Sequence, residues 1–328
     1  MEPIDTQRIF SIQNAAQFEA VALAVFKYQY HQNGVYRKFC DYLGKSDRTV
    51  AQLVDVPFLP IEFFKSHQVV CGNQKPEAIF ESSGTTQSQT SKHFVPDLSL
   101  YEQSFLNAFS LFYGPVEDYC ILALLPSYLE RQGSSLVYMV NDLVKLSNQP
   151  SSGFYLSNLE ELHKKLSELE QQGTKTLLIG VSFALMDLAE KFPMPLKNTT
   201  IMETGGMKGR RKELIREELH LILKKAFGVQ TIHSEYGMTE LLSQGYSHGN
   251  GIFRSPPWMK ILTRDSEDPL SFQTEGKTGG INVIDLANLY SCSFIATQDL
   301  GKTFPDGSFE VLGRFDNSDI RGCNLLVF

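Results

Sequence analysis

The sequence predicts an α/β protein with substantial parallel sheet, and three observations support this fold class. From about residue 77 onward, short runs typical of β-strands alternate with longer runs of helical periodicity, as in sheets whose strands are joined by helices. The 328 residues are 42% hydrophobic and 20% charged, a globular composition sufficient for a large core. Past residue 251, the helical pattern fades and short strands joined by Gly, Pro and Asp turns replace it.

The predicted elements begin with a helix at Asn14. Gln17 completes a capping box with Asn14, and apolar residues recur at helical spacing from Phe18 to Phe26. Strands are expected at residues 78–81, 119–125, 176–179, 200–203 and 229–233. Helices are expected between these strands, at residues 98–112, 134–146, 158–171, 182–191 and 208–227. Three later strands are expected at residues 281–285, 293–297 and 308–312.

Charge and cysteine content exclude several classes of protein. The formal net charge is −7, so nucleic acid is not an expected partner. Five cysteines without a Cys-x-x-Cys pair argue against a disulfide framework and a zinc site, and favour the reducing cytoplasm. The N-terminus does not resemble a signal peptide, and the longest apolar runs are far shorter than a membrane span. We therefore expect a cytoplasmic protein with no membrane span.

A loop rich in Ser and Thr follows the strand expected at residues 78–81. It runs from Ser82 to Lys92 and contains Gly84. A polyphosphate needs short hydrogen-bond donors, a backbone that can approach closely and a cation, and this loop contains all three. A solvated linker has the same composition, so the loop alone leaves both interpretations open.

Three further segments follow this loop in a fixed order. The first is Thr204-Gly205-Gly206-Met207, and the second is Tyr236-Gly237-Met238-Thr239-Glu240. The third comprises residues 297–301, Thr-Gln-Asp-Leu-Gly, and residues 313–316, Gly-Arg-Phe-Asp. Together with the loop, these segments resemble the ordered motifs of the adenylate-forming superfamily, which includes acyl-CoA synthetases, phenylacetate-CoA ligases and firefly-type luciferases. Residues 125–135 are similar to the acyl-protein synthetase branch, whose bioluminescence members activate fatty acids for reduction to aldehydes.

The resemblance implies a fold and an activity. The fold would be the large-domain fold of the superfamily, with parallel and mixed sheets flanked by helices and a smaller β-rich C-terminal portion. Residues 1–250 would bind ATP and the acyl group, and residues 251–328 would complete the nucleotide site. The activity would be that of an acid–thiol ligase. ATP would convert a carboxylic acid, fatty or otherwise hydrophobic, into acyl-AMP and pyrophosphate, and the acyl group would pass to a thiol. That thiol would belong to the enzyme itself, a carrier protein or coenzyme A, and a reductase is a further possible partner.

The resemblance also implies roles for individual residues. The β- and γ-phosphates would be held by the loop residues Ser82, Ser83, Gly84, Thr85, Thr86, Ser88 and Lys92. Backbone close to the adenine would come from Gly205, Gly206 and Met207, and the purine would stack on Tyr236 in the motif that also contains Gly237 and Met238. The catalytic residues would be Lys92, Thr239 on the α-phosphate, Glu240 as a ligand of Mg²⁺, and Arg314 near the ribose or phosphates. Asp299 would accept hydrogen bonds from the ribose hydroxyls.

Ordinary structural roles remain possible for the same residues. Tyr236 could be a core aromatic residue, Glu240 a solvated helix residue and Asp299 a turn former. Gln87 also occupies a position where the superfamily commonly has a second glycine. This altered loop, together with the expected absence of a mobile C-terminal domain, keeps open the alternative that the protein is a catalytically silent module that binds adenylate.

The segment after the last motif is short. The chain ends twelve residues after Asp316, so we expect it to lack the small mobile C-terminal domain and the second catalytic lysine of most superfamily members. Acyl-protein synthetases are understood to hold the acyl group on a cysteine near the C-terminus, and Cys323 is the candidate here. The alternative is that Cys323 is a small apolar residue that fills space.

Overall fold

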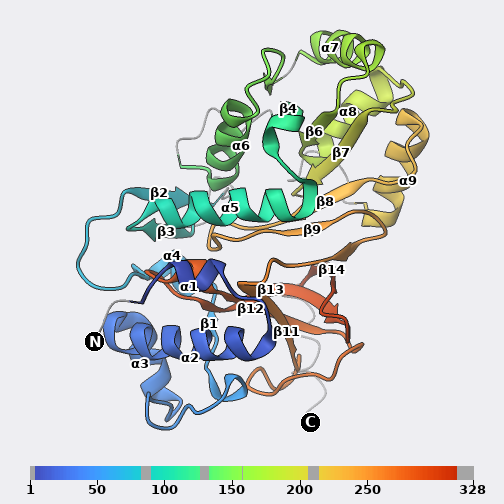
Figure 1. Cartoon of the computed structure of the whole chain (residues 1–328). Helices are drawn as coiled ribbons and strands as arrows, with labels where there is room; N and C mark the ends of the chain where they lie inside the picture. Colours follow the sequence, from blue (N-terminus) through green and yellow to red (C-terminus); the bar gives the residue numbers. More distant parts are fainter. Residues whose placement is uncertain (1–3, 83–89, 126–132, 157, 206–213, 316–328) are drawn as a thin grey trace. The chain divides into compact units, whose positions relative to one another are not determined.

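A computed structural model describes residues 4–82, 90–125, 133–156, 158–205 and 214–315 (Figure 1). The chain forms two compact units, each assembled from separated segments. The first unit contains Met1–Tyr101, Glu240–Ser243 and Arg254–Phe328. The second unit contains Glu102–Thr239 and Gln244–Phe253. The predicted boundary at residue 250 rests on expected ligand-binding roles and not on compactness. The division into residues 1–250 and 251–328 therefore stays a prediction.

The second unit is built on a six-stranded sheet with the strand order β5-β4-β6-β7-β8-β9. Neighbouring strands are parallel from β5 to β8, and β9 runs antiparallel to β8. The strands are β4 (Cys120–Leu124), β5 (Gly153–Tyr155), β6 (Thr176–Gly180), β7 (Thr199–Thr204), β8 (His233–Tyr236) and β9 (Gly245–Ser247). Every residue of β4 and β6 is buried, as expected for central strands of a parallel sheet that is covered on both faces.

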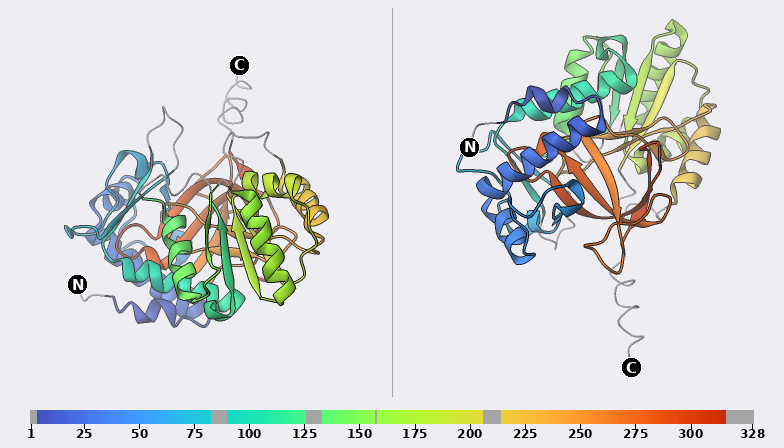
Figure 2. Two further views of the ribbon diagram at one scale, coloured as in Figure 1. Left: turned by 90° about the horizontal axis from the view of Figure 1, so that it is seen from above. Right: turned by 60° about the horizontal axis from the view of Figure 1, so that its bottom comes forward.

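Helices join these strands, and their faces follow from the direction of each crossover. The chain moves one way along the sheet from β4 to β5 and the opposite way from β5 through β6 and β7 to β8. Since such crossovers are right-handed, α6 lies on one face and α7, α8 and α9 lie on the other. The left view of Figure 2 shows strands between the green helix α6 and the yellow-green helices. The bounds are α5 (Leu98–Tyr113), α6 (Ser135–Leu146), α7 (Leu159–Gln172), α8 (Ser182–Lys191) and α9 (Arg216–Phe227).

Helix α7 illustrates how the sequence sets these boundaries. Asn158 accepts a hydrogen bond from the backbone N–H of Glu161 at 3.1 Å and so caps the N-terminus. Leu162, Leu166 and Leu169 recur at helical spacing on the buried face. Gly173 ends the helix with a φ of 68°, a left-handed conformation that glycine adopts without steric cost.

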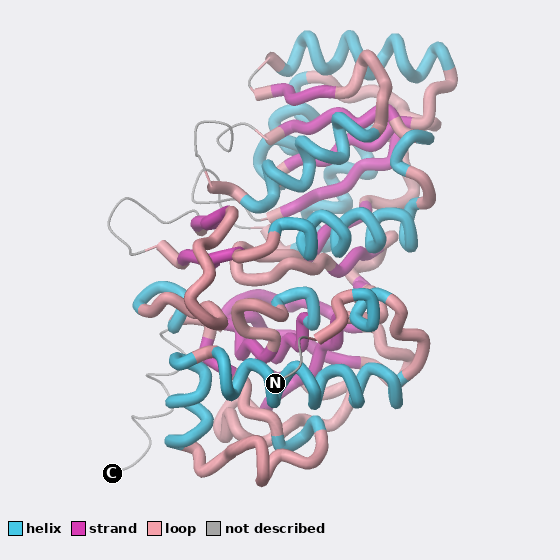
Figure 3. The backbone as a smooth tube through the Cα atoms, turned by 60° about the vertical axis from the view of Figure 1, so that its left-hand side comes forward, coloured by secondary structure: helices cyan, strands magenta, loops and turns pink. Residues whose placement is uncertain are grey.

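The first unit contains an antiparallel sheet with the strand order β14-β13-β12-β11, and β1 runs parallel to β13. Strands β2 and β3 form a separate antiparallel pair. Figure 3 distinguishes the strands in magenta from the helices in cyan. The strands are β1 (Leu59–Pro60), β2 (Ala78–Glu81), β3 (Lys92–Val95), β11 (Met259–Arg264), β12 (Gly279–Asp285), β13 (Phe294–Thr303) and β14 (Phe309–Arg314). The helices are α1 (Gln7–Phe10), α2 (Ala15–Gln32), α3 (Gly34–Tyr42) and α4 (Phe63–Ser66).

The remaining elements are short. They are the 3₁₀ turns η1 (Leu53–Asp55), η2 (Val116–Asp118) and η3 (Leu286–Asn288), and the strand β10 (Ile252–Phe253).

Helix α2 packs on the antiparallel sheet through a buried aromatic cluster. The Phe26 ring lies 6.1 Å from the Tyr36 ring and 6.2 Å from the Phe294 ring of β13. The buried Gln29 amide donates to the carbonyl oxygens of Asn288 and Leu289, both at 3.0 Å. Because a buried amide without partners costs about 1–3 kcal/mol, these bonds fix the position of α2 as well as stabilise it.

The predicted fold class is confirmed: parallel sheet, flanking helices and a second, antiparallel sheet are all present. The residues predicted for the helix after Asn14 form α2, and the helix predicted at 182–191 is α8. The strand predicted at 229–233 is wrong in position, because β8 begins at His233. Helix α3 and strand β11 were not predicted. Within the described part of the chain, no helix is long and apolar enough to cross a membrane.

Candidate active site

The carboxyl ends of β6, β7 and β8 gather polar side chains at one edge of the second unit's parallel sheet. Ser182 follows β6, and its hydroxyl donates to the Gly205 carbonyl oxygen at 2.5 Å, with the Glu203 carboxylate a second acceptor at 3.2 Å. Gly205 follows β7 with a φ of 72°, a conformation that favours glycine. The contact with Ser182 therefore fixes the turn that leads into the predicted adenine-binding segment.

Two carboxyl groups at this edge, the buried Glu203 and the partly buried Glu235, have opposite electrostatic environments. Burial acts to raise the pKa of Glu203, but the nearby His220 ring and the charge of Arg216 outweigh it and lower the pKa. Arg216 Nε and His220 Nε2 each lie 3.6 Å from Glu203 Oε1. Burial raises the pKa of Glu235 to about 7, against the effect of a 2.5 Å hydrogen bond from Thr204 Oγ1. Glu203 therefore ionises more readily than Glu235.

Tyr236 and Gly237 lie at the end of β8 beside Glu235. The Tyr236 side chain is buried, and its ring lies 6.1 Å from the Phe253 ring in an edge-to-face arrangement. A Cβ atom at Gly237 would lie 2.3 Å from Glu235 Oε1, so a side chain at position 237 would displace that carboxyl group. The burial of Tyr236 is compatible with a core aromatic role as well as with stacking on a purine.

Glu240 belongs to the first unit, and the backbone around it is fixed by two buried side chains. Its carbonyl oxygen accepts a hydrogen bond from Asn288 Nδ2 at 2.8 Å. The N–H of Leu242 donates to Asp285 Oδ2 at 2.9 Å and to Asn288 Oδ1 at 3.0 Å. Ser243 donates to the Asp285 carboxylate through both its backbone N–H, at 2.8 Å, and its hydroxyl, at 2.6 Å.

Sequence reasoning did not identify Asp285 and Asn288 as functional residues. The available signal was that an acidic residue ended a strongly apolar predicted strand and an Asn followed three residues later. Burial raises the pKa of Asp285 to about 6, while the donors from residues 242, 243 and 287 oppose that shift. We interpret both side chains as positioning residues for Glu240.

The Glu240 carboxyl group is itself buried, with 5% of the residue exposed. Burial raises its pKa, whereas a side-chain hydrogen bond with Ser91 and the charges of Arg314 and Lys65 act to lower it. Glu240 lies outside any helix, so the interpretation of Glu240 as a solvated helix residue is wrong. Its carboxylate and the nearby cations form an environment suited to an anionic ligand and its metal ion.

A magnesium ion fits this arrangement only if a bound phosphate also coordinates it. Among the described residues, no group of three or more His, Cys, Asp or Glu side chains could hold a metal ion. Mg²⁺ is commonly bound by one or two carboxylates together with substrate phosphates and water. Glu240 could therefore hold a magnesium ion that is shared with a phosphate.

Asp299 and Arg314 form a cross-strand pair between β13 and β14. Arg314 Nε lies 3.4 Å from Asp299 Oδ1, and the Arg314 side chain is 80% exposed. Asp299 is buried and its N–H donates to Thr297 Oγ1 at 3.1 Å. Because Asp299 lies within a strand, the interpretation of Asp299 as a turn former is wrong.

Strands β2 and β3 close the two ends of the predicted phosphate-binding loop. Ser82 donates its N–H to the Ser91 carbonyl oxygen at 3.0 Å and accepts the Ser91 N–H on its hydroxyl at 2.9 Å. Lys92 begins β3, and its Nζ lies 3.1 Å from Glu81 Oε1 at the end of β2. Several predicted residues lie outside the described part of the chain: Ser83, Gly84, Thr85, Thr86, Ser88, Gly206, Met207 and Cys323.

The predicted site residues thus form two groups. In the first unit, Lys92, Glu240, Asp299 and Arg314 lie on or next to β3, β13 and β14. In the second unit, Gly205 and the segment from Tyr236 to Thr239 lie at the carboxyl edge of the parallel sheet. Thr239 and Glu240, which are consecutive in the chain, belong to different units.

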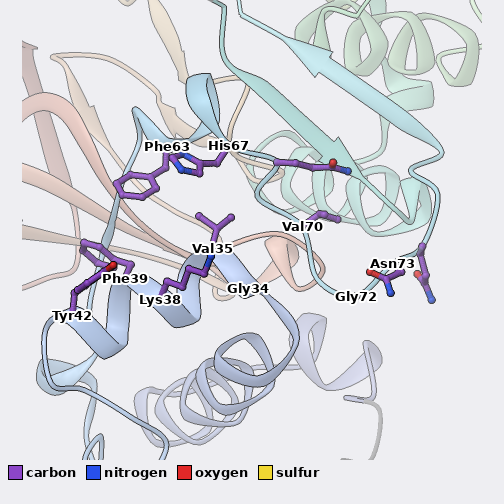
Figure 4. Close-up of a pocket in the computed structure, with 12 residues that line it drawn as sticks. Gly34, Val35, Lys38, Phe39, Tyr42, Phe63, His67, Val70, Gly72 and Asn73 are labelled. Carbon is purple, nitrogen blue, oxygen red and sulfur yellow. The ribbon is translucent and has the colours of Figure 1, made fainter.

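A cavity of about 700 Å³ in the first unit contains none of the predicted site residues. Figure 4 shows Phe39 and Tyr42 of α3 on one wall and Phe63 and His67 on the other. The Phe63 and His67 rings stack with their centroids 5.1 Å apart. Its lining combines apolar rings with polar side chains and does not include Glu240.

Comparison with known proteins gives a family match along almost the whole chain. A family model described as "Acyl-protein synthetase, LuxE" matches residues 9–327. A relative from Vibrio harveyi, a long-chain-fatty-acid–luciferin-component ligase, is 23% identical over 350 residues. That alignment covers 98% of this chain and 90% of the relative.

Solved structures with the same fold include adenylate-forming ligases. ATP-bound MatB from Rhodopseudomonas palustris aligns with a TM-score of 0.56 and 16% identity, covering 85% of this chain and 56% of MatB. 2-Hydroxyisobutyryl-CoA ligase in a postadenylation state aligns with a TM-score of 0.67 and 12% identity, covering 97% of this chain and 72% of the ligase. The chain spans about half the length of the first solved structures that it matches. At these identities, the likeness establishes the fold alone.

Proposed function

Because the chain belongs to the acyl-protein synthetase family, we propose that it uses ATP to activate a carboxylic acid as an acyl-adenylate. The observation that carries this proposal is the environment of Glu240. This carboxylate is buried, follows Thr239 directly, is fixed through Asn288 and lies under the influence of Arg314 and Lys65. Such a preorganised charged group suits a reaction in which negative charge has to be neutralised and positioned.

In the proposed reaction, a carboxylate oxygen of the acid attacks the α-phosphorus of ATP. A new P–O bond forms, the bond between the α-phosphorus and the bridging oxygen breaks, and pyrophosphate leaves with the electron pair. The acid is already ionised at neutral pH, so no general base has to remove a proton. Mg²⁺, when bound, would neutralise phosphate charge, and Glu240 is the proposed protein ligand.

The other residues would bind and orient the nucleotide. Asp299, an acceptor held in β13, is proposed to bind the ribose hydroxyls, and its neighbour Arg314 is exposed enough to reach ribose or phosphate. Thr239 is proposed to donate to the α-phosphate. Gly205 and Tyr236 are proposed to line the adenine. The hydrogen bond from Ser182 that holds the turn at Gly205 and the contact of the Tyr236 ring with the Phe253 ring support this role.

The proposed substrate is a fatty or other hydrophobic acid, and the proposed product is a thioester. The name of the Vibrio harveyi relative, a long-chain fatty acid ligase, supports this class of acid. The acyl acceptor would be the thiol of Cys323, a carrier protein or coenzyme A, and a reductase would be a partner that consumes the activated acyl group.

One contact bears on the alternative that the protein binds adenylate without catalysis. Lys92, the proposed phosphate-binding cation, forms an ion pair with Glu81. Catalysis requires Lys92 to exchange this partner for phosphate, whereas a silent module does not. The ion pair is half exposed, and exposed pairs contribute only about 0–1 kcal/mol, so the exchange costs little.

The test is ATP–pyrophosphate exchange with a panel of straight-chain fatty acids and aromatic acids. The proposal predicts exchange with at least one acid and a loss of about 100-fold or more in Glu240→Ala and Lys92→Ala. Glu267→Ala is the matched control, because Glu267 is an exposed carboxylate of the same unit. Nucleotide binding by calorimetry without exchange for any acid would identify a silent module instead.

A further inference from the structure

Helix α4 (Phe63–Ser66) is a single turn whose start is fixed next to the Asp299 strand. The preceding strand β1 pairs with β13, and the N–H of Ile61 donates to the Ala296 carbonyl oxygen at 3.0 Å. Glu62 then accepts a hydrogen bond from Gln298 Nε2. Since Gln298 directly precedes Asp299, α4 begins beside the proposed ribose-binding residue.

The other side of α4 contacts β3, the strand that begins with Lys92. The Phe64 ring lies 5.6 Å from the His93 ring, nearly perpendicular to it, and both side chains are buried. His93 Nε2 is hydrogen-bonded to Ser291 Oγ at 2.8 Å, and Ser291 Oγ lies 3.3 Å from the carbonyl oxygen of Asn288. The helix is therefore attached to the network that positions Glu240.

Lys65 directly follows the anchored Phe64 in α4, and its side chain is exposed. The neighbouring cations Lys92 and Arg314 are each paired, with Glu81 at 3.1 Å and Asp299 at 3.4 Å. The charge of Lys65 acts on the Glu240 carboxyl group. Lys65 is thus an exposed cation on a helix whose backbone is fixed beside the neighbours of Asp299 and Lys92.

The proposed reaction needs such a cation. The acid carboxylate has to approach the α-phosphate, and two unit charges 4 Å apart repel by about 4 kcal/mol near a protein surface. Glu240 adds a third anion to this centre. A single Mg²⁺ shared with the other phosphates does not balance all of these charges.

We propose that Lys65 is a further catalytic residue, whose ammonium group contacts the acid carboxylate and the α-phosphate where they react. This inference rests on the proposed function. No proton is transferred: Lys65 stabilises negative charge on the non-bridging oxygens while the new P–O bond forms and pyrophosphate leaves. Its role is distinct from that of Lys92, which belongs to the loop proposed for the β- and γ-phosphates.

The test compares Lys65→Met and Lys65→Arg with Lys27→Met, an exposed lysine on α2 of the same unit. Lys65→Met should lower the maximal rate of ATP–pyrophosphate exchange about 100-fold, with the KM for ATP within about threefold of wild type. Lys65→Arg keeps the positive charge, so its maximal exchange rate should be at least tenfold higher than that of Lys65→Met. Because Lys65 is exposed, the melting temperatures of all three variants should stay within about 3 °C of wild type. An exchange rate in Lys65→Met equal to that in Lys27→Met would overturn the inference, as would equal losses in the Met and Arg variants.

A binding measurement separates failure of this inference from failure of the proposed function. A non-reactive acyl-sulfamoyl adenosine, which mimics the acyl-adenylate, is titrated into wild type and Lys65→Met by calorimetry. We expect the Kd to rise about tenfold in Lys65→Met. An unchanged Kd, or no binding to wild type, would contradict the inference about Lys65. Absence of exchange in wild type would instead refute the proposed catalysis.

Discussion

The dependence of the Glu240 backbone on Asn288 can be tested with Asn288→Ala. Asn288 is fully buried and makes hydrogen bonds to the carbonyl oxygens of Glu240 and Cys292 and from the N–H of Leu242. Alanine leaves both carbonyl oxygens without this donor, while the Leu242 N–H keeps Asp285 at 2.9 Å. Each unsatisfied buried group costs about 1–3 kcal/mol. The free energy of unfolding should therefore fall by about 2–6 kcal/mol.

The assay is urea unfolding of wild type, Asn288→Ala and the control Asn198→Ala, followed by ATP–pyrophosphate exchange. Asn198 is exposed and its side chain donates to the surface carboxylate of Glu170 at 3.3 Å, so its loss should change stability by about 0.5 kcal/mol or less. Asn288→Ala should also lower exchange, because the backbone of Glu240 is no longer held. Equal stability of Asn288→Ala and Asn198→Ala would refute the reasoning.

Three other perturbations test separate parts of the account. Burial raises the pKa of Glu235 from 4.5 to about 7, so the folded state binds the proton more tightly than the unfolded state. The contribution of Glu235 to the free energy of unfolding is complete below pH 4.5 and is lost as pH rises through 7. Glu235→Gln should remove up to about 3 kcal/mol of this pH dependence between pH 5 and 8. Equal pH dependence of stability in wild type and Glu235→Gln would contradict this prediction. In Gly237→Ala, the new Cβ would lie 2.3 Å from Glu235 Oε1 and displace that carboxyl group from Thr204. Calorimetry should show the affinity for ATP reduced by more than about tenfold. Unchanged affinity would count against the proposed adenine site. Burial raises the pKa of all four described cysteines, so a thiol reagent should modify at most Cys323 in the native protein; modification that persists in Cys323→Ser would disprove this.

The parts of the fold predicted from sequence are those with local signals. Asn14 caps α2 by accepting the Gln17 N–H at 3.0 Å, as the capping-box pattern predicted. Strand β8 was misplaced because its residues include the polar Ser234, which is buried, and Glu235, which is partly buried, and nothing in the local sequence indicates this. Their burial depends on Thr204 and His220, which are distant in sequence.

In the candidate site, too, the sequence predicted what has a local signal and missed what depends on contacts between distant segments. The ordered motifs identified Glu240 and Asp299 as candidates, but sequence alone could not exclude surface roles for them. Their burial results from packing between distant segments, such as the contact of Glu240 with Asn288. Lys65 was not identified for the same reason: a lysine next to two phenylalanines has no local sign of function. Its interest arises from the anchoring of α4 to β13 and β3.

The central claim is that the carboxylate of the acid attacks the α-phosphorus of ATP. The most direct test uses a fatty acid labelled with ¹⁸O in both carboxylate oxygens, in a complete turnover with a thiol acceptor and analysis of the nucleotide by mass spectrometry. The account predicts AMP that carries one ¹⁸O atom, because the attacking oxygen stays on phosphorus when the acyl group leaves. Unlabelled AMP, or label in inorganic phosphate together with formation of ADP, would contradict it.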